Sequence, residues 1–197
     1  MREHPITSRR GRRPLRAAAA LALAATAGWA STASAATSDA QITVTGGSLG
    51  LTVADFQPQG ATLTGAAQTI ATTPAGPWTA VDARGTGAGW SVVASAGPLV
   101  SAGTPNRVID SANLAITTGA ITAGTGADPA TGISGASAAA FTAPTGPGQT
   151  NVALLATPGP HRGSYSFTPQ LDVTVPANAL PSHPGVPYTS MLTVTIS

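Results

Sequence analysis

The chain of 197 residues contains no cysteine and no lysine, and charged residues make up only 8% of it. The absence of cysteine excludes a disulfide scaffold, a thiolate zinc site, an iron–sulfur cluster and a cysteine nucleophile. Aromatic residues are scarce, at 4%, whereas glycine and proline are plentiful, at 23 and 17. All nine basic residues are arginines, and six of them lie within the first 16 residues. The basic character of the chain therefore belongs mainly to its N-terminal end.

The first 35 residues have the three-part pattern of a secretory signal peptide. A basic segment over residues 1–16 is followed by an apolar segment over residues 17–30, and then by the small residues Ala33, Ser34 and Ala35. The apolar segment is too short and too rich in alanine to span a bilayer. We therefore predict cleavage after Ala35 and a secreted protein that is extracellular or associated with the cell wall.

The export route is predicted from the same arginines. Residues 8–10 are Ser-Arg-Arg, which resembles the start of a twin-arginine signal. Arg12 and Arg13 then stand where that signal requires apolar residues. The sequence therefore favours the Sec route over the twin-arginine route.

Removal of the leader would change the charge of the chain. From residue 36 on, three arginines stand against six aspartates, which gives a net charge of −3. Nucleic acids and anionic lipids are bound by clustered cations, so neither is an expected partner. No later stretch is long and apolar enough for a transmembrane anchor.

Residues 36–197 show the two-residue period of half-buried strands. The alternating runs are bounded by Gly, Pro, Asn and Ser, and they begin at Ile42, Leu49, Trp90, Leu114, Val152, Tyr165, Leu171 and Tyr188. A sustained helical stripe is missing, and frequent Gly and Pro would break one. We expect a single all-β domain, an antiparallel β-sandwich of the immunoglobulin-like or jelly-roll-like kind with about nine or ten strands.

Two segments of this domain lack the alternation. Residues 119–150 consist mostly of Gly, Ala, Thr, Ser and Pro, and we expect a flexible surface excursion with one short strand. Residues 176–187 contain four prolines, which predicts a rigid connection before the last strand.

Few residues after the leader could carry catalysis. His161 and His183 lie in turns rich in Pro and Gly, where exposed turn histidines are expected. The aspartates are scattered singly, and a Gly-x-Ser-x-Gly elbow with a plausible base is missing. We therefore predict no metal site, no cofactor and no enzymatic activity.

Residues 77–92 contain two tryptophans, an arginine and an aspartate between two strand-like pieces. Trp78 and Trp90 could stack on sugar rings while Asp82 and Arg84 bind hydroxyl groups, so these four are the candidate glycan-binding residues. In the structural alternative, Trp90 fills the core, and Asp82 and Arg84 pair locally to hold the hairpin.

The order of several short motifs resembles the WxL-type cell-wall-binding domains of Gram-positive bacterial surface proteins. The motifs are the leader, Thr45-Gly46-Gly47-Ser48-Leu49, Asp82-x-Arg84-Gly85, Gly89-Trp90-Ser91-Val92, Val175-Pro176-Ala177 and the closing residues 187–196. Trp90-Ser91-Val92 matches the first Trp-x-Leu motif of that family with valine in place of leucine. Val194-Thr195-Ile196 occupies the place of the second motif, without its tryptophan.

This resemblance implies a surface protein held non-covalently at the cell wall. The expected partner is peptidoglycan or another cell-wall polymer, with other surface proteins as further candidates. An alternative function is that of a structural subunit, whose sheet edges or C-terminal strand pair with neighbouring subunits. In a third arrangement, the C-terminal strand simply completes the sandwich of its own chain.

Overall fold

The computed structural model describes residues 41–57, 59–141 and 150–197, which form fourteen β-strands, one 3-10 turn and no α-helix. The elements are β1 (Leu49–Thr52), β2 (Gln68–Thr72), β3 (Trp78–Asp82), β4 (Ser91–Ala96), β5 (Leu99–Ser101), β6 (Arg107–Ile109), η1 (Ser111–Asn113), β7 (Leu114–Thr117), β8 (Ile121–Ala123), β9 (Ser134–Gly135), β10 (Ala139–Ala140), β11 (Thr150–Ala156), β12 (Gly163–Phe167), β13 (Gln170–Val175) and β14 (Leu192–Ile196). The strands pair antiparallel, which confirms the expected all-β sandwich. Strands outnumber the nine or ten expected, since short strands such as β5, β6, β8, β9 and β10 form outside the alternating runs.

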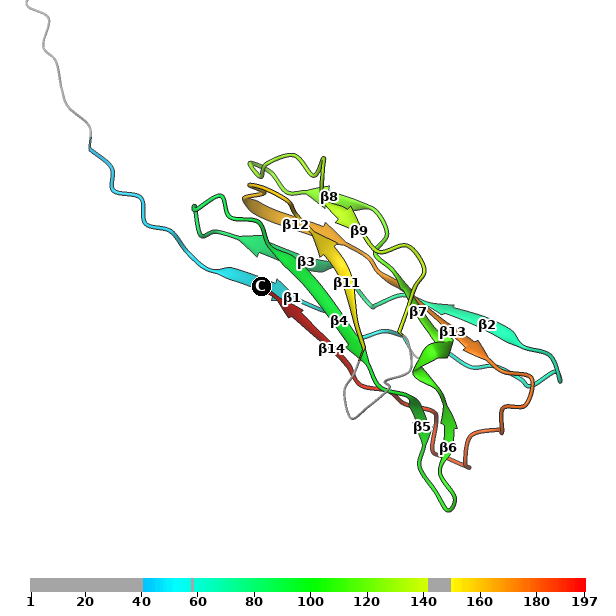
Figure 1. Cartoon of the computed structure of the whole chain (residues 1–197). Coiled ribbons are helices and arrows are strands. Elements are labelled where there is room, and N and C mark those ends of the chain that lie inside the picture. Colours follow the sequence, from blue (N-terminus) through cyan, green and yellow to red (C-terminus); the bar gives the residue numbers. More distant parts are fainter. Residues whose placement is uncertain (1–40, 58, 142–149) are drawn as a thin grey trace, which may run out of the picture. The chain divides into compact units, whose positions relative to one another are not determined.

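One layer of the sandwich is a bent sheet made of two four-stranded parts. Their strand orders are β1-β3-β12-β8 and β10-β7-β13-β2. Three chain segments cross from one part to the other, since β2 leads into β3, β7 into β8 and β12 into β13 (Figure 1). The bend lies at Thr168 and Gly119, where a Cβ on Gly119 would come within 2.5 Å of the Thr168 carbonyl oxygen. Gly119 also has a φ of +78°, which favours glycine at this position.

The facing layer is the sheet β14-β4-β11-β9, from which the β5–β6 hairpin continues. Val92, Ala94 and Ala96 of β4 point inward and are buried. They pack against the bent layer in a core that also contains Trp78, Trp90, Leu114, Ile116, Phe141, Leu154, Leu155, Tyr165 and Phe167.

The two layers are joined by hydrogen bonds along one long side. The Thr118 hydroxyl, which is buried, donates to the Leu154 carbonyl oxygen at 2.6 Å and accepts from the Ala136 amide at 2.8 Å. The Thr118 amide in turn donates to the Ala136 carbonyl oxygen. We call the part of the sandwich formed by β3, β12, β8, β4, β11 and β9 the closed half.

The end of the sandwich beyond the bend is less well covered. We call β2 and β13, with the facing β5, β6 and residues 180–191, the open half. Leu171 and Val173 of β13 are only half-buried there, although they continue the inward-facing row of the fully buried Tyr165 and Phe167. The same chain segment therefore contributes to a dry core at one end and to a partly exposed surface at the other.

Two expectations about the alternating runs need correction. Residues 41–48 are extended but unpaired as strands, and the side chains of Ile42 and Val44 are 86% and 88% exposed. In the final run only β14 pairs with β4, whereas Tyr188 precedes the strand. Alternation indicates β-forming ability, but a strand also needs a partner edge.

The expected excursion over residues 119–150 contains three short strands, β8, β9 and β10, where one was expected. Its Phe141 is completely buried, which anchors this segment to the core. Residues 142–149 lie outside the described part. Residues 176–187 connect β13 to the final segment through turns at residues 177–178 and 184–185, with an isolated bridge between His183 and Val186. The expected rigidity of this connection stays a prediction. In the part of the chain that the structure describes, we find no helix suited to crossing a membrane.

Candidate functional site

The two tryptophans predicted to contact a glycan lie in the core. Trp78 is 1% exposed and Trp90 is 3% exposed. The Trp78 indole donates to the Ala54 carbonyl oxygen at 2.8 Å, and the Trp90 indole donates to that of His161 at 2.9 Å. Both side chains are almost completely buried, so this structure does not support their stacking on a sugar, and Trp90 fills the core as the structural alternative predicted.

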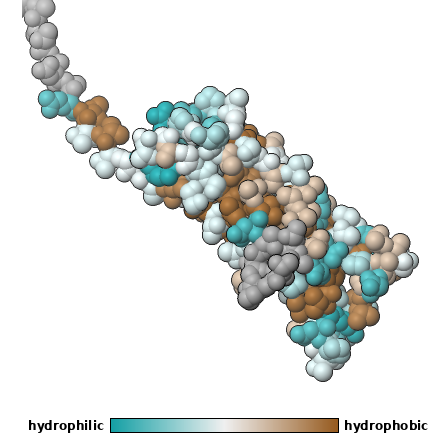
Figure 2. Space-filling model, viewed as in Figure 1, coloured by the Kyte–Doolittle hydropathy of each residue, from teal (hydrophilic) through white to brown (hydrophobic). Residues whose placement is uncertain are grey.

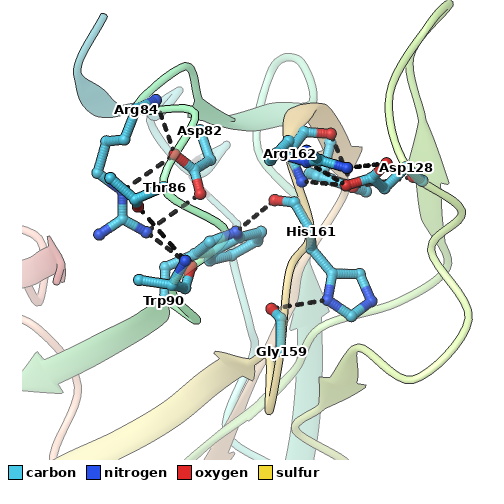
Figure 3. Close-up of polar contacts among 10 residues, drawn as sticks. Asp82, Arg84, Thr86, Trp90, Asp128, Gly159, His161 and Arg162 are labelled. Carbon is cyan, nitrogen blue, oxygen red and sulfur yellow. Dashed lines mark hydrogen bonds and ion pairs between the residues drawn. The ribbon is translucent and has the colours of Figure 1, made fainter. Parts of the chain in front are cut away.

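Asp82 and Arg84 form a local ion pair at the end of β3 (Figure 3). The Arg84 guanidinium donates through Nε to Asp82 Oδ1 at 3.0 Å and through Nη2 to Oδ2 at 3.1 Å. The same Nη2 reaches the carbonyl oxygens of Ala88 and Gly89. Hydrogen bonding to Arg84 lowers the pKa of the buried Asp82 carboxyl below its usual value. These groups satisfy one another and hold residues 83–89, as the structural alternative predicted.

His161 belongs to the same end of the closed half, and the expectation that it is exposed is wrong. Its side chain is buried beside Tyr165, with ring centroids 6.2 Å apart. Its Nδ1 lies 3.2 Å from the Gly159 carbonyl oxygen, and its Nε2 lies 3.0 Å from that of Thr131. The neighbouring Arg162 binds Asp128 at 3.0 Å, as Figure 3 shows. This end of the molecule is a network of satisfied contacts.

The residues at the place of the second Trp-x-Leu motif lie on β14. Val194 stands opposite Ala94, and Ile196 stands opposite Val92. Both side chains are half-buried and pack against the core, whereas Thr193 and Thr195 are exposed on the outer face. Val194 and Ile196 therefore complete the sandwich of their own chain, as the third arrangement expected for the last strand.

The described residues contain no group of three or more potential metal-ligating side chains. Their aspartates lie apart, and Asp82 and Asp128 are each engaged by an arginine. His183, the second histidine, is half-buried and directs Nε2 to the Pro105 carbonyl oxygen at 3.0 Å. The two arginine–aspartate pairs thus stabilise the chain segments next to them.

A large hollow lies in the open half. It has a volume of about 860 Å³ and is lined mainly by apolar side chains, among them Ile70, Leu99, Ile109, Val173, Leu180 and Tyr188. A second hollow of about 640 Å³ borders β14 and is lined by Phe56, Trp78, Leu114, Met191, Leu192 and Val194. In Figure 2, hydrophobic surface is visible in the part of the molecule that contains β5 and β13.

These two hollows adjoin each other, because Phe56, Leu99 and Leu171 line both of them. We call the two adjoining hollows together the open seam. One wall consists of residues 53–57 and 59–63, the other consists of residues 187–194, and β13 contributes to the floor. The seam therefore separates the two layers along the side opposite Thr118.

The wall formed by β14 is the edge of its sheet. Ser91 and Ser197 exchange both backbone hydrogen bonds, at 2.7 and 3.0 Å. Because such pairs alternate along an antiparallel ladder, Thr193 and Thr195 direct their backbone groups toward β4. Leu192 and Val194 therefore direct their N–H and C=O groups away from β4, and these groups have no backbone partner within the described residues.

The open seam was not predicted from the sequence. The alternation identified β13 and the last strand, but it carried no information on whether another strand faces them. One signal was present in the connection before β14, where Leu180 and Met191 are large apolar residues outside the strands, and both are exposed. Exposed apolar side chains that gather in one place are typical of interaction surfaces.

Comparison of the chain with protein-family models, with curated proteins and with solved structures finds no match. The resemblance to WxL-type domains therefore stays a prediction, and the function is argued from the geometry of the open seam.

Proposed function

We propose that the chain is a secreted, non-catalytic surface subunit that binds an extended polypeptide segment in its open seam. The observation that carries the proposal is the combination of an apolar groove with a free strand edge along its wall. An added strand would receive main-chain hydrogen bonds from the edge, and the groove would receive every second side chain. This is the alternative function expected from the sequence, with the site moved to the seam.

The edge favours a polypeptide over a small apolar molecule. Leu192 and Val194 present outward N–H and C=O groups beside half-buried side chains. A hydrocarbon ligand could fill the groove but would leave these groups without partners, whereas a strand satisfies both requirements. The apolar side chains of β13 that contribute to the floor recur at every second residue, which matches the side-chain period of an incoming strand.

The test uses a peptide of seven alternating threonines and valines as the probe. We expect saturable binding to the secreted protein, measured by fluorescence anisotropy of the labelled peptide. The double variant Leu180→Asp/Met191→Asp should lose binding, because it places two carboxylates along the seam. Val108→Asp is the matched control, since Val108 is exposed on β6 and lines neither hollow. Equal binding by all three proteins would contradict the proposal.

Retention at the cell wall is a second candidate function, and the outer face of the bent sheet supports it. Thr52, Thr79, Ser166 and Thr122 stand opposite one another across β1, β3, β12 and β8. This row of uncharged hydroxyl groups is chemically suited to hydrogen bonding with a glycan. In this second candidate function, the hydroxyl row takes the place of Trp78, Asp82, Arg84 and Trp90 as the glycan-binding surface.

The wall-binding candidate is tested by co-sedimentation with purified peptidoglycan. If the hydroxyl row binds the polymer, Thr52→Val/Thr122→Val should reduce pelleting, because both side chains are exposed and lose only a hydroxyl group. Thr193→Val/Thr195→Val on the opposite sheet is the control. Absence of pelleting by the folded parent protein would remove this candidate.

A further inference from the structure

We infer that the segment bound in the open seam is residues 41–45 of a second copy of this chain. The inference rests on the proposed function and names the partner. Residues 41–45 have the sequence Gln-Ile-Thr-Val-Thr. Ile42 and Val44 belong to the large apolar side chains that the structure leaves exposed, at 86% and 88%. We call residues 41–45 the arm.

The arm has the pattern of the strand that the seam lacks. Its two apolar residues alternate with threonine, as Leu192 and Val194 alternate with Thr193 on β14. An arm strand beside β14 would turn Ile42 and Val44 toward the groove and its threonines toward solvent. β-Branched residues also favour the extended conformation that pairing requires.

The length of the arm fits the edge. β1 lies beside the C-terminal end of β14, so the part of the edge that borders the seam is Leu192–Val194, and residues 42–44 of the arm match it in length.

Charge does not oppose this contact. The arm carries no charged side chain. Of the side chains that line the two hollows only Asp55 is charged, and it is exposed. Insertion of the arm would therefore bury no unpaired charge, which is the usual cost of burying a polar segment.

The position of Gly47 favours an arm from another copy over the chain's own arm. The Gly47 amide donates to the Ala83 carbonyl oxygen at 2.7 Å, and a Cβ on Gly46 would come within 2.4 Å of the Arg84 carbonyl oxygen. The end of the arm is thus held at the closed half, where β1 begins. To enter its own seam the arm would have to reverse at these glycines and run back along β1.

Such an exchange joins two different surfaces, the arm of one copy and the seam of the next. A contact of this kind is heterologous, and it leads to rings or to growing chains. It differs from a two-fold dimer, in which the same surface of both copies meets.

The absence of cysteine allows a direct test by disulfide crosslinking. Two single variants of the secreted protein, Thr43→Cys and Met191→Cys, are mixed and oxidised. Met191 precedes β14 beside the seam, is 76% exposed and has the parity of the outward-facing Thr193, which is the face expected for Thr43 of the arm. We expect a mixed disulfide dimer at least tenfold more abundant than in a mixture of Thr43→Cys with Val108→Cys, whose residue 108 is 56% exposed outside the seam. Mass spectrometry of the N-terminus would establish that the leader has been removed.

The double variant Thr43→Cys/Met191→Cys separates exchange from folding back. A ladder of linked chains supports the inference, whereas a monomer with an internal disulfide overturns it. If the alternating threonine–valine peptide binds but Thr43→Cys and Met191→Cys do not crosslink, the inference fails and the proposed function stands. If neither the peptide nor the arm engages the seam, both fail.

Discussion

The closed half and the open half are built from the same long chain segments, yet they bury their apolar residues to different extents. Along β12 and β13, Tyr165 and Phe167 are fully buried, whereas Leu171 and Val173 remain half-exposed. The residues follow one inward-facing pattern, and the difference lies in what faces them. β4 and β11 cover the first pair, but the second pair contributes to the floor of the open seam. An apolar strand face thus becomes core or binding surface according to its partner.

The largest expected effect is the loss of the Trp90 ring from the closed half. Trp90→Ala should lower the free energy of unfolding by about 3–5 kcal/mol, because the cavity left between β4 and Tyr165 cannot collapse. Val173→Ala in the open half should cost only about 1 kcal/mol, since its side chain is half-exposed already. Urea unfolding of both variants measures the two costs. Equal costs would contradict the division into two halves.

Two glycines offer a second comparison. A Cβ on Gly89 would come within 2.4 Å of the Thr157 carbonyl oxygen, a backbone atom of the closed half. Gly89→Ala should therefore destabilise by about 2 kcal/mol. At Gly103 the obstacle is the His183 ring, which can rotate away. Gly103→Ala should cost about 1 kcal/mol, because rotation of the ring breaks the hydrogen bond between His183 and the Pro105 carbonyl oxygen. Thermal unfolding would show the order, and a larger loss for Gly103→Ala would contradict it.

The Asp82–Arg84 pair makes the closed half sensitive to acid. Because the pKa of Asp82 is lowered in the folded state, its contribution is present above the ordinary carboxyl pKa of about 4. It is lost as the pH falls below that value through the folded-state pKa. Asp82→Asn should cost about 1.5 kcal/mol at pH 7 and flatten the acid limb of the stability curve.

The control for this pH dependence is Asp128→Asn. Arg162 lowers the pKa of Asp128 in the same direction through hydrogen bonding, but both side chains are more exposed than Asp82. Solvent screens such a pair, so the acid limb should change less. Urea unfolding between pH 2.5 and 7 compares the variants, with the pH range set by the ordinary carboxyl pKa. A greater change of the acid limb for Asp128→Asn than for Asp82→Asn would contradict the claim that the acid sensitivity arises mainly from Asp82.

The smallest effect on stability is expected in the seam itself. Leu180→Asp/Met191→Asp should change the free energy of unfolding by less than about 0.5 kcal/mol per site, because both side chains are exposed. The same variant should lose binding of the alternating peptide. A large loss of stability would show that these residues support the fold, and the binding defect would then carry no information on the seam.

The sequence was sufficient to predict the fold class, and the reason is the two-residue period of its apolar runs. The bends at Gly119 and Thr168 were not predicted, because they depend on a close approach between distant segments. The same limit applies to the tryptophans. Pattern alone could not decide whether Trp78 lies at a rim or in the core, since the deciding contact is a hydrogen bond to Ala54 on another segment.

The seam could not be predicted for a related reason. A sequence shows which residues of β14 share a face, but it does not show which edge of the strand stays unpaired. The unpaired arm was likewise expected to form a strand from Ile42 and Val44. Within one copy that expectation is wrong, because the arm has no partner strand. The alternation of Ile42 and Val44 with threonines nevertheless suits the arm to pairing with another copy.

The most direct test of the open seam is residue-resolved amide hydrogen exchange with and without the alternating threonine–valine peptide. We predict that the outward amides of Leu192 and Val194 become protected at saturating peptide, because the added strand pairs with them. The Thr193 amide, which is directed toward β4, should exchange at the same rate in both samples. Unchanged exchange at Leu192 and Val194 would contradict the claim that the seam receives a strand.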